Sequence, residues 1–361
     1  MDKLRVGIVY GGRSVEHEVS IASATSIREA LDPSRYELTL IAVSQDGRWR
    51  LGAPGALPAT AVTGEEVTLP AVPGQRTLLS VASGAPAAEL DVIVPIVHGS
   101  GGEDGSLQGF LELAGVPYVG AGVLGSALQM DKEVAKRLLR AEGIPVVPWI
   151  GVTAAEWEGS PGEVVDRVLR AIGLPCFVKP ANSGSSVGIH KAKTRDGLLE
   201  ALRDAARYDT KLLIEQAVNA SEIEVAVLGN DAPEASVPGE IVPKAEWYDY
   251  EAKYVDERTE LIVPAPLDEA QVAEVQQLAL RAFRSLEGAG LARVDFFLDR
   301  DTGRFYVNEL NSLPGFTEVS MYPRLWQASG LPYPALLDRL IELAIERGRT
   351  RQGLERTYRR G

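Results

Sequence analysis

The chain has 361 residues, of which 45% are hydrophobic and 24% charged, and its formal net charge is −13. This length suffices for two or three domains with large buried cores, and the sequence contains no apolar run of about 18 residues that could span a membrane. The acidic balance argues against a nucleic acid as the main partner, because phosphate backbones need clustered Lys and Arg.

The first residues and the cysteine content both favour the cytoplasm. The chain enters a predicted strand at once and lacks the features of a signal peptide. Cys176 is the single cysteine, lies in an apolar run and is most simply a small core residue. We therefore expect a cytoplasmic protein with no membrane partner.

Predicted strands and helices alternate in residues 1–127. The apolar runs and helical spacings that indicate them are strands at 4–12, 36–44 and 91–99, and helices at 20–31 and 105–115. This alternation is typical of an open parallel α/β sheet. Residues 52–88 are rich in Ala, Pro, Gly and Thr, show no clear period, and are predicted to be a variable excursion that could contain a hairpin.

Residues 128–361 are predicted to form two further units and a tail. Residues 128–216 predict a compact α+β unit, with helices at 130–143, 161–172 and 194–206. Residues 217–346 predict a third unit of antiparallel character, with helices at 268–287 and 333–347. The tail 347–361 carries six Arg and is most simply a solvated helix end.

One long loop is predicted inside the third unit, at residues 243–262. It is polar and aromatic with no sustained period, and loops of this length in compact domains are usually functional or disordered. Its aromatic residues, which include Trp247 and Tyr254, argue against plain disorder. We predict that it is a lid.

A hairpin at 293–311 carries the clearest chemical signal. If Asp299, at the turn "DRDTGR", pairs with about Arg304 or Phe305, Asp295 lies opposite Glu309. The same register puts Arg293 opposite Asn311. Side chains two residues apart share a face, so these four would cluster with Phe297 beside them, whereas a slip of one residue would separate them.

The clustered oxygens favour a hard cation. Carboxylate and amide oxygens suit Mg²⁺, with phosphate and water completing an octahedron. The alternative is two solvated acids on an edge hairpin, which the apolar surroundings disfavour. Directly afterwards, a turn at Pro314 and Gly315 could aim backbone N–H groups at this face. Arg293 with a glycine N–H would then stabilise an anion.

A loop of small residues at 179–190 predicts a phosphate site. Lys179 offers a fixed cation, and the glycines and serines after it let the backbone approach an anion closely. Lys132, at the start of the preceding helix, supplies a second cation. The order of lysine and glycine differs from that of a Walker A loop. Glu215 and Glu222 flank a strand-to-linker region that could present groups to a base or ribose.

Together these motifs resemble a known family. The stretches "GGRSVEHEVS", "HGSGGEDG", "MDKEVAKRLL", "VKPANSGSSVGI", "EAKY" and "NELNSLPGFT" occur in the order seen in the D-alanine:D-alanine ligases of the ATP-grasp superfamily. The resemblance extends over about residues 4–345. It implies an ATP-grasp fold, in which an N-terminal α/β domain precedes two α+β subdomains that clamp ATP.

The resemblance also implies roles for individual residues. Those expected to hold ATP are Lys132, Lys179, Glu215, Val218, Glu222 and Lys253, with Phe297 against the adenine. Those expected to hold two Mg²⁺ or Mn²⁺ ions are Asp295, Glu309 and Asn311. Arg293 and the Gly315 N–H would stabilise an oxyanion. Glu16 would bind the ammonium of the first D-alanine in a network with Ser185 and Tyr254, with His98 nearby, and Ser320 would contact the carboxylate of the second.

The implied reaction joins two D-alanines through an acyl phosphate, for peptidoglycan precursor synthesis, in a homodimer. The alternatives that remain are a D-alanine:D-lactate or D-serine ligase, an NAD-binding dehydrogenase and a catalytically inactive ATP-binding module. The dehydrogenase is disfavoured because the sequence lacks the Gly-x-Gly-x-x-Gly pattern after its first strand.

Overall fold

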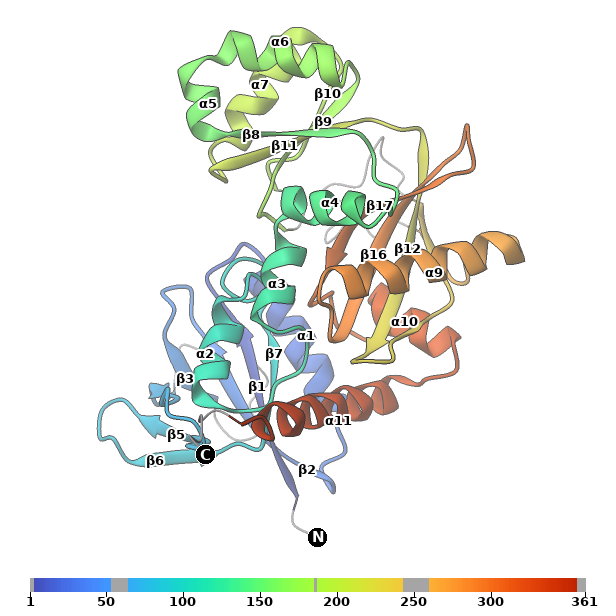
Figure 1. Ribbon diagram of the computed structural model, residues 1–361. Coiled ribbons are helices and arrows are strands. Elements are labelled where there is room, and N and C mark those ends of the chain that lie inside the picture. Colours follow the sequence, from blue (N-terminus) through green and yellow to red (C-terminus); the bar gives the residue numbers. More distant parts are fainter. Residues whose placement is uncertain (1–2, 53–63, 185–186, 243–259, 356–361) are drawn as a thin grey trace, which may run out of the picture.

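The structure is a computed structural model that describes residues 3–52, 64–184, 187–242 and 260–355 (Figure 1). The predicted lid therefore lies almost entirely outside the described residues, as do Ser185, Lys253 and Tyr254. No helix in the described ranges is long and apolar enough to cross a membrane.

The open parallel sheet predicted for the first part of the chain is confirmed. Strand β1 (Leu4–Gly11) pairs in parallel with β2 (Tyr36–Val43) and with β7 (Val92–Ile96), while the short edge strand β3 (Trp49–Leu51) is antiparallel to β2. The sheet's helices are α1 (His17–Ala30), α2 (Ser106–Ala114) and α3 (Val123–Met130). All five residues of β7, the last strand in the sheet order, are buried, as expected for a parallel strand that is covered on both faces.

The excursion between β3 and β7 contains a small sheet of its own. Its strands are β4 (Val67–Thr68), β5 (Thr77–Ser80) and β6 (Pro86–Glu89), paired antiparallel in the order β4-β5-β6. The hairpin considered for this stretch is therefore present, as β5 and β6, although residues 53–63 lie outside the described ranges.

A second, antiparallel sheet of four strands follows (Figure 1, top). Its strands in spatial order are β10 (His190–Ala192), β9 (Cys176–Pro180), β11 (Lys211–Gln216) and β8 (Trp149–Thr153). The helices of this unit are α5 (Ala154–Gly159), α6 (Pro161–Ala171) and α7 (Arg195–Ala205), and they pack on the sheet in one apolar cluster. Cys176 is fully buried in that cluster, as predicted.

The remaining sheet has six strands and is antiparallel throughout. Its strands are β12 (Ala220–Gly229), β13 (Glu234–Ala235), β14 (Gly239–Val242), β15 (Glu260–Ile262), β16 (Gly290–Asp299) and β17 (Phe305–Asn311). Helix α9 (Glu269–Ser285) packs on this sheet, and α10 (Met321–Ala328) contacts β12. Helix α4 (Lys132–Ala141) leads from the first unit to the second (Figure 1).

The last helix, α11 (Tyr333–Gln352), returns to the first sheet. It contacts β7 and α1, and its apolar residues share one buried cluster with β1, β2 and α10 (Figure 1). The interpretation of the whole tail from 347 as solvated is wrong at its first residue. Arg347 packs over the Tyr118 ring, 4.6 Å from its centroid, and donates to the backbone carbonyls of Tyr118 and Gly120. Paired in this way, its guanidinium can be buried without losing its hydrogen bonds.

The register of the β16–β17 hairpin agrees with the prediction for the two residue pairs that carry the polar side chains. Arg293 lies opposite Asn311, and Asp295 opposite Glu309. Between Asp295 and the turn the pairing shifts by one residue, which leaves Asn308 as the extra residue of a β-bulge. Without that bulge, Glu309 would lie opposite Val294 and face away from Asp295.

Candidate active site

A cavity of about 690 Å³ collects predicted site residues from distant parts of the chain. Its walls come from α1, the segment after β7, the start of α4 and both hairpin strands. The predicted residues that line it are Glu16, His98, Lys132, Arg293, Glu309, Asn311, Gly315 and Ser320. Residues from several of the quoted motifs thus line one cavity, whereas Lys179, Glu215, Glu222, Asp295 and Phe297 do not line it.

The hairpin places its polar side chains in direct contact. Arg293 binds Asp295 with two hydrogen bonds, from Nε to Oδ1 and from Nη2 to Oδ2, each 2.7 Å long. Asn311 Nδ2 also donates to Asp295 Oδ2, at 2.9 Å. The arginine, the carboxylate and the amide therefore share one face, as the register predicts.

A glutamate that sequence reasoning missed completes this group. Glu224 on β12 lies opposite Asp295 of β16, and its Oε2 is 3.0 Å from Arg293 Nε. Burial alone would lower the pKa of Arg293, but Asp295 and Glu224 raise it well above its usual value. The guanidinium is therefore a permanent cation. The signal that could have found Glu224 is its spacing of two from Glu222, which puts both on one face of a strand.

Lys132 connects the hairpin to the glycine loop. Asp131 caps α4 by accepting a hydrogen bond from Val134 N at 3.0 Å, so Lys132 occupies the first turn. Its Nζ lies 3.2 Å from Glu309 Oε2 and donates to the Ser183 carbonyl at 2.8 Å. Two motifs more than 120 residues apart in sequence thus meet at one lysine.

Lys179 lies in a buried cluster of charges beside this lysine. Its Nζ is 2.6 Å from Glu215 Oε2, and Lys136 Nζ is 2.7 Å from Glu215 Oε1. Burial would raise the pKa of Glu215, but the two lysines lower it to about 2. Asn308, the bulge residue, accepts a hydrogen bond from Lys179 at 3.2 Å. One carboxylate between two lysines leaves a net positive charge, which suits an anionic ligand.

Sequence reasoning missed Lys136 and Asn308. Lys136 follows Lys132 by four residues and so lies on the same face of α4, a spacing that could have revealed it. Asn308 could not have been found in this way, since only the bulge turns it toward Lys179. Burial lowers the pKa of Lys136, against the opposing effect of Glu215.

The predicted base-binding residues lie next to the lysines. The Lys179 ammonium is 5.8 Å from the centroid of the Phe297 ring. Glu222 on β12 lies directly opposite Phe297 on β16, and Val218 lies in the connection between β11 and β12. The Phe297 ring thus lies near a lysine and opposite a glutamate on the neighbouring strand.

Glu16 lines the same cavity and lies beside the glycine loop. It immediately precedes α1, is only 7% exposed, and its Oε2 lies so close to Gly99 and Gly184 that a Cβ on either would be 2.5 Å away. The glycine loop that carries Gly184 therefore touches Glu16. The predicted partners Ser185 and Tyr254 lie outside the described residues.

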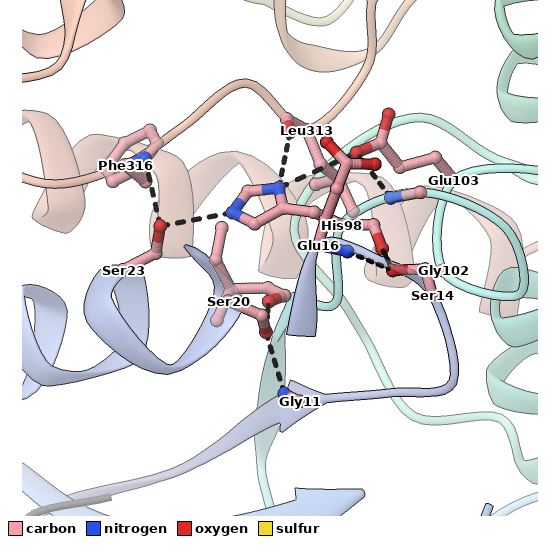
Figure 2. Close-up of polar contacts among 12 residues, drawn as sticks. Gly11, Ser14, Glu16, Ser20, Ser23, His98, Gly102, Glu103, Leu313 and Phe316 are labelled. Atoms are coloured by element: carbon pink, nitrogen blue, oxygen red, sulfur yellow. Dashed lines mark hydrogen bonds and ion pairs between the residues drawn. The ribbon is translucent and has the colours of Figure 1, made fainter. Parts of the chain in front are cut away.

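His98 is buried beside Glu16 (Figure 2). Its Nδ1 is 2.9 Å from the Leu313 carbonyl and 3.6 Å from Glu103 Oε1, and its Nε2 is 3.1 Å from Ser23 Oγ. Glu103, a further residue that sequence reasoning missed, accepts a hydrogen bond from the Gly99 N–H at 3.2 Å. Burial raises the pKa of Glu103 despite the neighbouring His98.

Ser320 also lines the cavity. It immediately precedes α10, and its Oγ lies 2.7 Å from Thr317 Oγ1 and accepts from the Thr317 N–H at 3.1 Å. A Cβ on Gly315 would stand 3.4 Å from the same Oγ. Gly315 and Ser320 therefore lie next to each other in the cavity wall.

The donor set of the hairpin fits a hard divalent cation. Within the described ranges, no three His, Cys, Asp or Glu side chains gather as a metal-binding group. The hairpin instead offers two carboxylates and an amide, all oxygen donors, beside the lysine cluster. Such a set leaves positions for phosphate oxygens and water around Mg²⁺.

The chain is similar to known proteins over almost its whole length. The sequence profile described as "D-ala D-ala ligase N-terminus" matches residues 5–121, and "D-ala D-ala ligase C-terminus" matches residues 138–342. A D-alanine–D-alanine ligase of Heliobacterium modesticaldum is 48% identical over 362 residues, covering 98% of this chain and 97% of the relative. One from Geobacillus kaustophilus is 46% identical, covering 99% of each.

Solved structures of ligases are similar to this one over nearly the whole chain. The D-alanine-D-alanine ligase from Coxiella burnetii has a TM-score of 0.85 at 38% identity, covering 98% of this chain and 97% of its own. A D-Ala:D-Ser ligase from Enterococcus faecalis also has a TM-score of 0.85, at 29% identity, covering 95% of this chain and 100% of its own.

Proposed function

The chain belongs to the D-alanine–D-alanine ligase family, and from this premise we propose how its residues join two D-alanines to D-alanyl-D-alanine. It has the ATP-grasp fold and the activity of an ATP-dependent ligase. The observation that carries the proposal is that one cavity joins Glu16, Lys132, Arg293 and Glu309.

We propose that one end of the site binds ATP. Lys132 and Lys179 hold the phosphates with Lys253 of the lid, while Glu215, Val218 and Glu222 hold the adenosine and Phe297 packs against the adenine. The support is the net positive cluster around Glu215 and the contact of the Lys179 ammonium with the Phe297 ring. Asp295, Glu309 and Asn311 would hold two divalent ions, Mg²⁺ or Mn²⁺, which neutralise charge on the transferring phosphoryl group.

The D-alanine end performs the acyl transfer. The carboxylate of the first D-alanine takes the γ-phosphoryl group of ATP, which gives an acyl phosphate and ADP. The amine of the second D-alanine then attacks the acyl carbon, and the tetrahedral intermediate expels phosphate. Arg293 and the Gly315 N–H stabilise the oxyanion of that intermediate, and a permanently charged, buried guanidinium suits this task.

The remaining predicted residues orient the two amino acids. Glu16 binds the ammonium of the first D-alanine, in a network with Ser185 and Tyr254, and His98 lies beside it. Ser320 contacts the carboxylate of the second. The position of Glu16 against Gly184 supports the network, because it brings the glycine loop to the D-alanine end.

The domain division follows from the same roles. Residues 1–127 hold the first D-alanine, residues 128–216 carry the glycine loop, and residues 217–346 carry the metal hairpin and the lid at 243–262. An acyl phosphate must be kept from water, and a closing lid would do so. We propose a cytoplasmic homodimer, an assignment that rests on the family alone.

One assay tests the proposal. Purified protein with ATP, Mg²⁺ and D-alanine should release phosphate in step with D-alanyl-D-alanine. The likeness to a D-Ala:D-Ser ligase makes the acceptor worth testing, so D-serine and D-lactate should each be offered with D-alanine. We expect the D-alanine dipeptide to dominate, and no phosphate release with D-alanine would overturn the proposal.

A further inference from the structure

A short segment of the site is anchored at both of its ends. The Leu313 carbonyl receives a hydrogen bond from His98 Nδ1 at 2.9 Å, and the Phe316 N–H donates to Ser23 Oγ at 3.2 Å. Ser23 and His98 also contact each other, with 3.1 Å between Oγ and Nε2 (Figure 2). Ser23 and His98 of the first unit, hydrogen-bonded to each other, are thus each hydrogen-bonded to the backbone of the third unit, at residues 316 and 313.

The donor and acceptor roles of these hydrogen-bonded groups can be assigned. His98 Nδ1 faces the Leu313 carbonyl and the Glu103 carboxylate, which are both acceptors, so Nδ1 carries a proton. The Ser23 hydroxyl can donate to a neutral Nε2 or accept from a charged one while it accepts from the Phe316 N–H. Ser23 is 0% exposed and His98 2%, so no bulk water competes for these bonds.

A further contact restrains Phe316. The Tyr333 hydroxyl, from α11, donates to the Phe316 carbonyl at 2.7 Å. The Phe316 ring lies 5.6 Å from the Tyr322 ring and 5.8 Å from the Tyr333 ring, centroid to centroid. Both peptide groups of this residue are therefore held.

Between these anchors, Gly315 lines the cavity. Among the residues that the structure describes, none accepts a hydrogen bond from the Gly315 N–H. The N–H is thus available to a ligand, while its direction is set by the anchored residues on either side. A backbone donor held in this way needs no reorganisation when charge develops on a reacting oxygen.

We propose that Ser23 is a positioning residue that, through His98 and the Phe316 N–H, aims the Gly315 N–H at the oxyanion of the tetrahedral intermediate. This inference rests on the proposed function, since it needs Gly315 as an oxyanion donor. Ser23 acts on the reaction through its neighbours. A residue that served only to join α1 to the third unit would affect stability and leave the chemical step alone.

The first test is Ser23→Ala. We expect kcat to fall about 10- to 100-fold, because small displacements of a catalytic donor have effects of that size. The KM values for ATP and for D-alanine should stay within about 2-fold, because neither ligand depends on the donor in its ground state. The affinity for a phosphinate analogue of the dipeptide, whose tetrahedral phosphorus mimics the intermediate, should fall by about the same factor as kcat.

Ser20→Ala is the matched control. Ser20 lies on the same helix, is equally buried, accepts from the Gly11 N–H at 2.7 Å and donates to the Ile96 carbonyl, but has no bond to residues 313–316. It should lower the melting temperature as Ser23→Ala does, with kcat and analogue affinity unchanged. Equal kinetics in the two variants would overturn the proposal.

A double-mutant cycle tests the route through His98. His98→Asn keeps an N–H near the place of Nδ1 but cannot reach Ser23. Because the two residues act as one unit, the double variant should be about as slow as His98→Asn alone. Additive losses would show that Ser23 acts independently, and the route through His98 would be wrong.

An unfolded variant or an inactive wild-type protein would each need a separate reading. If Ser23→Ala does not fold, Ser23→Cys keeps the size and a weak hydrogen bond, and its kcat and analogue affinity should fall together by a few-fold. If the unaltered protein makes no D-alanyl-D-alanine, the proposed function itself fails. A wild-type ligase with an unaffected Ser23→Cys or Ser23→Ala variant contradicts only the present inference.

Discussion

The buried carboxylate of Glu215 contacts two lysines, one on each oxygen. Removing three charges from water is costly, and such a cluster persists only when the charges neutralise one another or a ligand completes them. Here the excess positive charge faces the region where the ATP phosphates are proposed to lie. The cluster would therefore be prepared for an anion before the nucleotide arrives.

Lys136→Met tests this cluster. The change keeps the volume of the side chain but removes one cation, so we expect a higher KM for ATP. Breaking a buried pair usually destabilises by about 3–5 kcal/mol, and because Lys179 still pairs with Glu215 we expect a smaller loss, about 1–2 kcal/mol. Steady-state kinetics and urea unfolding measure the two effects. An unchanged KM would contradict a role for Lys136 in nucleotide binding.

Glu215 also predicts a pH dependence of stability. Its pKa is lowered from 4.5 to about 2, so its contribution to stability is complete above pH 4.5 and is lost as pH falls toward 2. In Lys136→Met, one of the charges that lower this pKa is gone, so the loss should begin at a higher pH. Free energies of unfolding measured between about pH 5 and pH 3 would show this, and parallel curves for the two proteins would contradict it.

Glu309→Gln tests the metal assignment. The amide keeps the shape of the side chain but removes a charged ligand, and we expect kcat to fall about 100-fold or more, because the metal contributes several kcal/mol to transition-state stabilisation. Glu318→Gln is the control, since Glu318 is exposed and does not line the cavity. Turnover at saturating Mg²⁺ and a melting curve for each variant distinguish lost chemistry from a lost fold. Near-normal turnover in Glu309→Gln would remove the assignment.

At the scale of elements, the β16–β17 hairpin shows what could and could not be predicted. The alternation of polar and apolar residues correctly indicated that Asp295 faces Glu309. The bulge at Asn308 was not foreseen, because no glycine or proline marks it. Bulges are set by the pairing of the whole strand with its neighbours, and here β16 is also paired along its full length with β12.

The glycine loop offers a prediction at the same scale. In Gly184→Ala the new Cβ would lie 2.5 Å from Glu16 Oε2, so either the loop or the carboxylate must move. We expect the KM for D-alanine to rise about 10-fold or more, because a displacement near 1 Å can cost a factor of about 100. An unchanged KM would show that Glu16 can move away without consequence.

The control is a glycine with open space around it. A Cβ on Gly162, near the start of α6, would meet no atom within 4 Å. Gly162→Ala should leave the kinetics unchanged and stabilise the protein slightly, by about 0.4–1 kcal/mol.

At the scale of the whole molecule, the site depends on packing that a single sequence does not reveal. The parallel sheet, the antiparallel third unit and the hairpin could all be predicted, since each follows from a local pattern. Asn308 and Ser23 could not be assigned in the same way. Their importance arises from contacts with distant segments, such as the 293 residues that separate Ser23 from Phe316.

A ligand that bridges these units should stabilise them together. ATP with Mg²⁺ at about 100 times its Kd should add about 2.7 kcal/mol to the free energy of unfolding and raise the melting temperature. With a chelator present we expect a much smaller shift, because the phosphates then lack the ions that join them to the hairpin. Equal shifts with and without the chelator would contradict the metal site.

The docking of α11 on the first sheet affects how the protein can be made. The buried cluster that contains β1 and β2 also contains Leu336, Leu340 and Ala344, near the end of the chain. A ribosome releases the N-terminal strands long before it releases this helix. The first unit therefore keeps one apolar face uncovered until α11 has been translated, and a chain that stops before Tyr333 should be bound by chaperones or degraded by proteases.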